Sequence, residues 1–182
     1  MTRRVLSVSG PPGAGKSTLV RAISAKLDAK PVYYDDYEVI TSWPPQKVIS
    51  WLDSGAPLDR AVAPGLREAI SNLDGLVILE TPFGPACPDV GPLVDAAVWL
   101  DCPLDLALAR KLSSLAENSA GNAGFQGFLV NWLNAYTDFT RRALLFQQEK
   151  VRPLTDLQVD AGGSREKVLS SVFSFVNHHF TP

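Results

Sequence analysis

A glycine-rich segment directly after a short apolar run constrains the fold of this chain more than any other feature. The segment has a first glycine, four further residues and then Gly-Lys-Ser, and it consists of Gly10, Pro11, Pro12, Gly13, Ala14, Gly15, Lys16 and Ser17. Glycine permits backbone conformations in which successive N–H groups point at phosphate oxygens. A helix that begins at Lys16 directs the positive end of its dipole at the same anion. We therefore expect a strand, a phosphate-binding loop and a helix, in this order.

The side chains at the end of this loop suit a nucleoside triphosphate with Mg²⁺. We expect Lys16 to reach the outer phosphates, Ser17 to offer its hydroxyl to Mg²⁺, and Thr18 to contact the inner phosphates. Such a short pattern also arises by chance in unrelated chains. Here, however, a predicted strand precedes it and a predicted helix follows it, as phosphate binding requires.

Short apolar runs alternate with helical patterns along the 182 residues. This alternation is typical of an α/β fold with a parallel sheet covered by helices, and the length suits a single domain spanning residues 1–182. The predicted strands are residues 5–9, 31–34, 75–80, 96–100 and 156–160. The predicted helices are residues 16–27, 46–53 and 64–73, one that begins near 103, and one after 164.

Two neighbouring segments in the second half of the chain differ sharply in composition. Residues 113–124 are mostly small or polar, and we expect them to form a mobile, lid-like loop. In residues 125–146, aromatic and aliphatic side chains recur at helical spacing. This periodicity predicts a helix whose apolar face packs in the core, an interpretation we prefer to an aromatic binding stripe.

Composition excludes several classes of protein. With 17 Lys and Arg against 19 Asp and Glu, the chain lacks the cationic excess of a nucleic-acid or membrane-surface protein. Its two cysteines are too few for a disulfide framework or a zinc-finger spacing. No signal-peptide core follows the first residues, and no apolar run is long enough to span a bilayer. We expect a cytoplasmic protein that acts as a monomer or a homodimer.

A phosphate-binding loop occurs in GTPases, motor ATPases and kinases. The sequence has no Asn/Thr-Lys-x-Asp segment for reading guanine, and the third predicted strand ends in Glu80 alone instead of the Asp-Glu pair of a motor ATPase. One acid after the second strand, one after the third and a flexible segment after the fourth are the parts of a small-molecule kinase.

The chain resembles the uridine kinase, nicotinamide riboside kinase and phosphoribulokinase group of P-loop kinases. The likeness lies in the loop of residues 9–17, in Asp35, Asp36 and Tyr37, in Glu80, and in Arg110 and Lys111 before the lid-like loop. It implies the P-loop NTPase fold, a three-layer sandwich with a five-stranded parallel sheet, helices on both faces and a lid. It also implies that the γ-phosphoryl group of Mg-ATP is transferred to a hydroxyl of a small metabolite, most often a nucleoside such as uridine or nicotinamide riboside.

Acids at the strand ends are the candidates for the chemistry. An alcohol attacks poorly until a carboxylate orients it and accepts its proton, and in the resembled kinases an Asp after the second strand does so. Asp35 fits that position best, and Asp36 is its alternative or a substrate ligand. Glu80 leaves an apolar strand at the sheet edge where ligands bind, to hold the Mg²⁺ shell or the substrate hydroxyls. Both acidic sites also have bland interpretations, a solvated turn and a strand cap.

Phosphoryl transfer also needs cations on the transferring group. Arg110 resembles the lid arginine of the family, but residues 113–124 contain no Lys or Arg, where related kinases carry further basic residues. Arg141 or Arg142 is a candidate substitute, although a solvated helix face explains them equally well. Arg152 is a candidate to flank the adenine base together with the glycines at 162 and 163.

The acceptor pocket is expected between the Asp35 turn, residues 43–58 and the loop that contains Phe83. Tyr37 and Phe83 lie next to the acidic strand ends and are candidate substrate-binding residues. Two alternatives to a nucleoside kinase stay open. One is a kinase for another small metabolite, such as a sugar acid, a pantothenate-like compound or a nucleotide. The other is a regulatory protein that binds ATP without catalysis.

Overall fold

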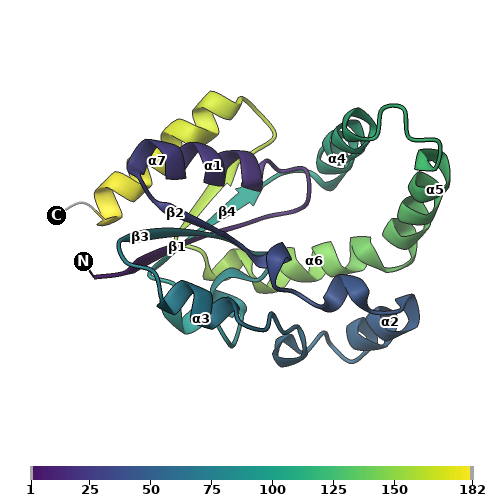
Figure 1. Cartoon of the computed structure of the whole chain (residues 1–182), viewed down its shortest axis with the longest axis horizontal. Helices are drawn as coiled ribbons and strands as arrows, with labels where there is room; N and C mark the ends of the chain where they lie inside the picture. Colours follow the sequence, from purple (N-terminus) through teal and green to yellow (C-terminus); the bar gives the residue numbers. More distant parts are fainter. Residues whose placement is uncertain (1, 181–182) are drawn as a thin grey trace.

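The computed structural model describes residues 2–180, and a five-stranded parallel sheet lies at its centre (Figure 1). The strand order is β2-β3-β1-β4-β5, and every neighbouring pair is parallel. The strands are β1 (Arg4–Ser9), β2 (Lys30–Tyr33), β3 (Leu76–Glu80), β4 (Ala96–Asp101) and β5 (Leu157–Asp160). This arrangement confirms the predicted P-loop NTPase fold.

Helices cover both faces of the sheet, as predicted. They are α1 (Lys16–Leu27), α2 (Pro45–Asp53), α3 (Leu66–Ser71), α4 (Leu104–Asn118), α5 (Phe125–Ala135), α6 (Arg141–Lys150) and α7 (Arg165–Phe180). A π-helical turn, η6 (Tyr136–Thr140), joins α5 to α6 without a break. In Figure 1, α1 and α7 lie on one side of the sheet, whereas α2, α3 and α6 lie on the other.

Alternate residues of the strands point to opposite faces of the sheet and pack in two separate hydrophobic cores. On the α1 and α7 side, Leu6 and Val8 of β1 pack against Ile23 of α1 and Val172 of α7. On the other side, the inward residues of β2 and β3 pack against α3 and against Trp51 of α2. Both faces of β1 are therefore covered, and every residue of the strand from Val5 to Ser9 is buried.

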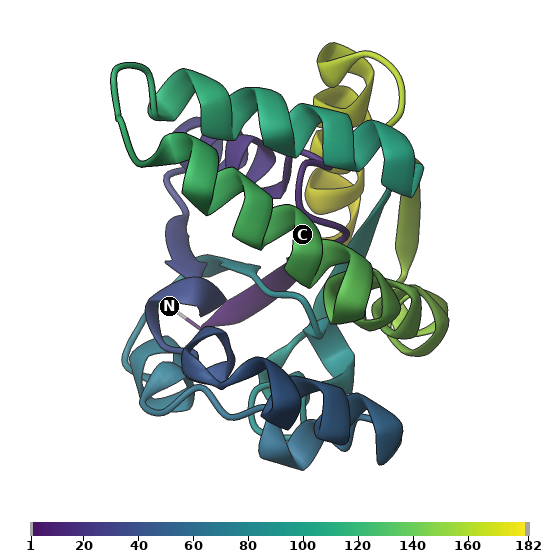
Figure 2. The same cartoon turned by 90° about the vertical axis from the view of Figure 1, so that its right-hand side faces the viewer.

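Helices α4, α5 and α6 together with η6 leave the sheet and return to it, and we call this excursion the arm. Figure 2 shows α4 and α5 crossing in front of the sheet edge before the chain turns back through α6. The arm begins directly after β4, at the carboxyl end of the sheet. It therefore lies over the edge at which open parallel sheets bind their ligands.

The arm differs from the sequence-based predictions in two respects. Residues 113–118, which we expected in a loop, continue α4, and only residues 119–124 form turns. The aromatic helix, expected in the core, reaches it only in its C-terminal part: Leu144 of α6 is buried and Phe146 packs against the core around Trp51, whereas no residue of α5 is buried. Phe128 is 50% exposed and Leu133 is 36% exposed, because α5 contacts neighbours along one side only. Within residues 2–180, no helix has the length and apolar character needed to cross a bilayer.

Candidate functional site

The phosphate-binding loop adopts a conformation that only glycine accommodates at critical points. Gly10, Gly13 and Gly15 all have positive φ angles, of 144°, 91° and 95°. A Cβ atom on Gly13 would lie 2.0 Å from the carbonyl oxygen of Ala107 in α4. One on Gly10 would lie 2.7 Å from the carbonyl oxygen of Leu100. The loop is thus held against the backbone of β4 and α4, and Gly15 opens helix α1.

Two side chains that follow the loop meet the acid at the end of β3. The hydroxyl of Ser17 donates to Glu80 Oε1 at 3.1 Å, and Lys16 Nζ lies 3.9 Å from the same oxygen. Both charged side chains are 13% exposed. Burial lowers the pKa of Lys16, while Glu80 and then Asp35 oppose this shift. The nearby carboxylates therefore help to keep a largely buried lysine charged.

Asp35 and Asp36 lie in a short 3-10 turn after β2, not at the end of the strand. Both are exposed, whereas the preceding Tyr34 is buried and donates its hydroxyl to the Ala61 carbonyl at 3.0 Å. Tyr34 also packs edge-on against Phe83, at 5.6 Å between ring centroids. Asp35, unlike Asp36, is close enough to Lys16 to influence its pKa. The charge of Asp35 thus acts on Lys16 from the turn after β2.

A buried hydrogen bond that the sequence analysis missed ties the loop to Glu80. Ser9 ends β1, and its hydroxyl donates to the Thr81 carbonyl at 2.8 Å, while the Thr81 N–H donates to the Val8 carbonyl at 3.1 Å. Ser9 and Thr81 are fully buried. Because Thr81 directly follows Glu80, these bonds fix the acid relative to the loop. Serine at alternate positions of an otherwise apolar buried strand was the available signal.

Arg110, the candidate lid arginine, is engaged by backbone carbonyls in this structure. Its guanidinium donates to the carbonyls of Ala161 at 2.6 Å and Gly162 at 3.0 Å, and contacts Cys102 Sγ at 3.7 Å. In this conformation Arg110 connects α4 to the loop between β5 and α7. The next residue, Lys111, instead lines the surface shared by α4 and Pro12 of the phosphate-binding loop.

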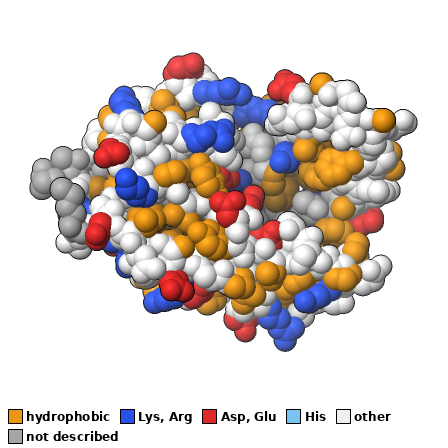
Figure 3. Space-filling model, viewed as in Figure 1, with side chains coloured by type: hydrophobic (Ala, Val, Ile, Leu, Met, Phe, Trp, Pro, Cys, Tyr) orange, Lys and Arg blue, Asp and Glu red, His pale blue; other side chains and the backbone are white. Residues whose placement is uncertain are grey.

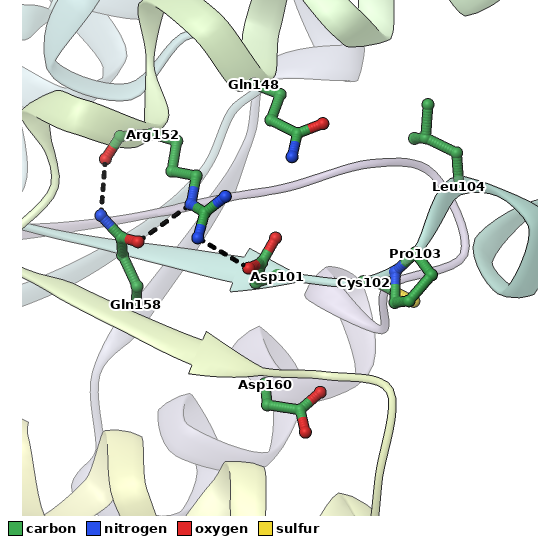
Figure 4. A pocket seen from close by; sticks show the side chains of 8 residues that line it. All are labelled: Asp101, Cys102, Pro103, Leu104, Gln148, Arg152, Gln158 and Asp160. Carbon is green, nitrogen blue, oxygen red and sulfur yellow. Dashed lines mark hydrogen bonds and ion pairs between the residues drawn. The ribbon is translucent and has the colours of Figure 1, made fainter.

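Arg152, the candidate for flanking adenine, is part of a separate polar pocket (Figure 4). It pairs with Asp101 at 2.9 Å and donates to the Gln158 side chain at 2.9 Å. The pocket lies at the carboxyl ends of β4 and β5 and has a volume of about 540 Å³. Asp160 also lines it, and its Oδ1 accepts from the Gly162 N–H. Arg152 therefore lines the same pocket as Asp160, which holds Gly162, and its guanidinium is engaged by Asp101.

Residues 43–58, which were predicted to line the acceptor pocket, pack against one another and against the arm. Trp51 is buried, donates to the Pro57 carbonyl at 3.0 Å and packs against Trp43 and Phe146. Arg142 of α6 pairs with Asp53 of α2 at 2.6 Å, which accounts for one of the two arginines considered as lid substitutes. Figure 3 shows the surface hollowed between the arm and the body of the molecule, with basic side chains on its upper rim. Tyr37 and Phe83 pack into the core beside Trp51.

The residues at the loop fit Mg²⁺ in the manner of a nucleotide site. Ser17 and Glu80 supply a hydroxyl and a carboxylate oxygen within hydrogen-bond distance of each other. No group of three or more His, Cys, Asp or Glu side chains suited to a metal occurs among residues 2–180. Mg²⁺ commonly takes one or two protein oxygens and completes its shell with water and substrate phosphates, so this small set suits it.

Neither a model of any protein family nor any curated protein sequence matches this chain. Solved structures with similar folds were found. Shikimate kinase from Acinetobacter baumannii in complex with shikimate superimposes with a TM-score of 0.58 and 12% identity, covering 100% of this chain and 97% of that one. Shikimate kinase from Aquifex aeolicus gives 0.54 and 12%, covering 96% of each chain. An unliganded sugar kinase from a Janibacter species gives 0.55 and 16%, covering 96% and 95%. These likenesses extend over the whole chain and show a shared fold.

Proposed function

We propose that this protein is a kinase that transfers the γ-phosphoryl group of Mg-ATP to a hydroxyl of a small metabolite. The observation that carries the proposal is the convergence of Lys16, Ser17, Glu80 and Asp35 at the carboxyl ends of three adjacent strands. A phosphate cradle, a partial metal shell and a carboxylate near the outer phosphates are what in-line phosphoryl transfer requires.

Each group has a distinct role in this proposal. The N–H groups of the loop and Lys16 bind the phosphates, and Ser17 and Glu80 would hold Mg²⁺, which when bound would neutralise charge on the transferring group. Asp35 orients the acceptor hydroxyl and takes up its proton. The acceptor oxygen then bonds to the γ-phosphorus while the bond to the bridging oxygen breaks, and ADP leaves. Asp36, Tyr37 and Phe83 are assigned to the surroundings of the acceptor.

The similar structures favour a sugar-like or acidic acceptor over a nucleoside. Two of them are shikimate kinases, one with shikimate bound, and a third is a sugar kinase. The resemblance to uridine kinases depends on short motifs outside the loop. We therefore place a small polyhydroxylated metabolite, such as a sugar acid, ahead of uridine or nicotinamide riboside. We also propose that residues 1–182 act as one kinase domain and that the lid-like segment of residues 113–124 moves at its turns, residues 119–124.

One observation keeps a second function in view, namely an ATP-binding regulator without catalysis. Residues 113–124 contain no Lys or Arg, and Arg110 is engaged by backbone carbonyls. A binding protein needs no cation on a transition state, so this composition suits it.

A panel of acceptors separates the two functions. ADP release from Mg-ATP is measured with sugar acids, shikimate, sugars, uridine and nicotinamide riboside. We expect one class to raise the rate. We expect Lys16→Ala to abolish ATP binding, and Asp35→Asn to keep binding but reduce turnover by about 100-fold or more. Asp74→Asn, an exposed acid at the amino end of β3 and so at the opposite edge of the sheet, is the matched control and retains the turnover. ATP binding with no stimulation by any acceptor would favour the regulator.

A further inference from the structure

Lys111 lies beside the phosphate-binding loop, one helical turn beyond the point where α4 contacts it. Ala107 is the residue whose carbonyl closely approaches Gly13. Residues four apart share one face of a helix, so Lys111 is directed to the same side as Ala107. It lines a narrow cavity together with Pro12 of the loop and with Tyr136 and Thr140 of η6. Its side chain is therefore enclosed by the loop, α4 and η6.

Lys111 has a like charge nearby and, among residues 2–180, no close counter-charge. The ammonium groups of Lys111 and Lys16 are near enough to repel each other. Lys16 has Glu80 nearby, whereas within residues 2–180 no carboxylate lies within 4.0 Å of the Lys111 ammonium. Two ammonium groups held near each other repel, and an anion that contacts both relieves the repulsion.

Of the basic residues of the arm, Lys111 lines the cavity beside the phosphate-binding loop, whereas Arg141 is exposed and does not line it. Arg110 is turned away to the carbonyls of Ala161 and Gly162. Arg142 is paired with Asp53 on α2. The turns that connect α4 to α5 contain no basic residue.

We propose that Lys111 binds the outer phosphates of the nucleoside triphosphate together with Lys16, and thereby supplies the charge that the lid-like segment lacks. This inference rests on the proposed function, because it assumes that a triphosphate occupies the loop. Since Lys16 serves the outer phosphates, its neighbour Lys111 discriminates a triphosphate from a diphosphate. It also gives α4 a direct contact to the group that is transferred.

The test compares Mg-ATP and Mg-ADP binding by calorimetry in the wild-type protein and three variants. We expect Lys111→Gln to weaken ATP binding by about tenfold and ADP binding by less than about threefold, because a hydrogen bond to a charged group is lost only with ATP. Lys111→Arg should restore ATP binding to within about threefold, since it keeps the charge. Lys150→Gln, an exposed site at the end of α6, removes the same charge and should change neither affinity.

Thermal unfolding of the ligand-free proteins checks for a purely structural role. Lys111→Gln should melt at a temperature no lower than the wild type, because a like-charge repulsion is removed. A lower melting temperature with equal losses for ATP and ADP would overturn the proposal, as would an unchanged ratio of the two affinities. If the wild-type protein binds neither nucleotide, the proposed function fails and this inference fails with it. If the wild type binds ATP and Lys111→Gln binds it equally well, only this inference fails.

Discussion

The region around β1 and the arm differ in how their side chains are packed: those of the first are buried, whereas many of those of the second are exposed. In β1 and the phosphate-binding loop, side chains are buried on both faces, buried hydrogen bonds fix the backbone, and Gly13 has no room for a methyl group. In α5, no residue is buried and large apolar side chains face solvent. The first region holds phosphate-binding groups that need a fixed geometry. The second contacts the body along one side only, which is typical of elements with low local stability.

The largest predicted difference comes from the same substitution in both regions. Gly13→Ala should destabilise the protein by about 3 kcal/mol or more and abolish Mg-ATP binding, because its Cβ would meet the Ala107 carbonyl at 2.0 Å in a backbone with φ of 91°. Gly127→Ala, within α5, meets nothing within 4 Å and should stabilise the protein by about 0.5–1 kcal/mol. Urea unfolding and calorimetry measure both. If Gly13→Ala binds ATP with wild-type affinity, the phosphate-binding loop does not need the fixed backbone that distinguishes it from α5.

A second pair of substitutions compares how much one leucine side chain contributes to the free energy of unfolding in each region. Leu6 in β1 is fully buried, and Leu6→Ala should lower the free energy of unfolding by about 2–5 kcal/mol. Leu133 in α5 is 36% exposed, and Leu133→Ala should cost less than about 1 kcal/mol. Both values come from urea titration at one pH. Comparable losses would mean that α5 is covered in solution, contrary to its exposure here.

The smallest predicted effect is a dependence of stability on pH that comes from the buried Lys16. Burial holds the pKa of Lys16 below its ordinary value of 10.5, so the folded protein releases this proton at a lower pH than the unfolded chain. Between those two pKa values the unfolded state binds more protons, and stability rises with pH. ATP affinity should fall over the same interval, because the lysine loses its charge. Lys16→Gln should lack this alkaline gain in stability, and an equal gain in that variant would exclude Lys16 as its source.

The sequence was sufficient for the fold because local signals agreed with one another. The residues of α1 coincide with the predicted helix, since the glycine loop sets its start and the apolar spacing sets its length. The apolar runs identified the five strands to within about one or two residues. Each signal there depends on neighbours in the sequence, and tertiary structure did not override it.

In the arm, local sequence patterns did not predict the tertiary contacts. Apolar periodicity in residues 125–146 identified a helical face but carried no information on what covers it, and α5 is left largely uncovered. Arg110 and Lys111 are adjacent in sequence, but successive helical residues point about 100° apart, so only the rotation of α4 decides which one faces the loop. Ser9 and Thr81 meet through strand pairing that no local pattern contains.

The close approach of Gly13 to Ala107 has a mechanical consequence for the arm. Because the first turn of α4 is pressed against the phosphate-binding loop, it cannot swing without displacing the loop itself. Any bending of α4 must take place after Ala107, and the bending point is therefore separated from the sheet. If α4 bends there, the turns at 119–124 and α5 would move while the first turn of α4 stays in contact with the phosphate-binding loop.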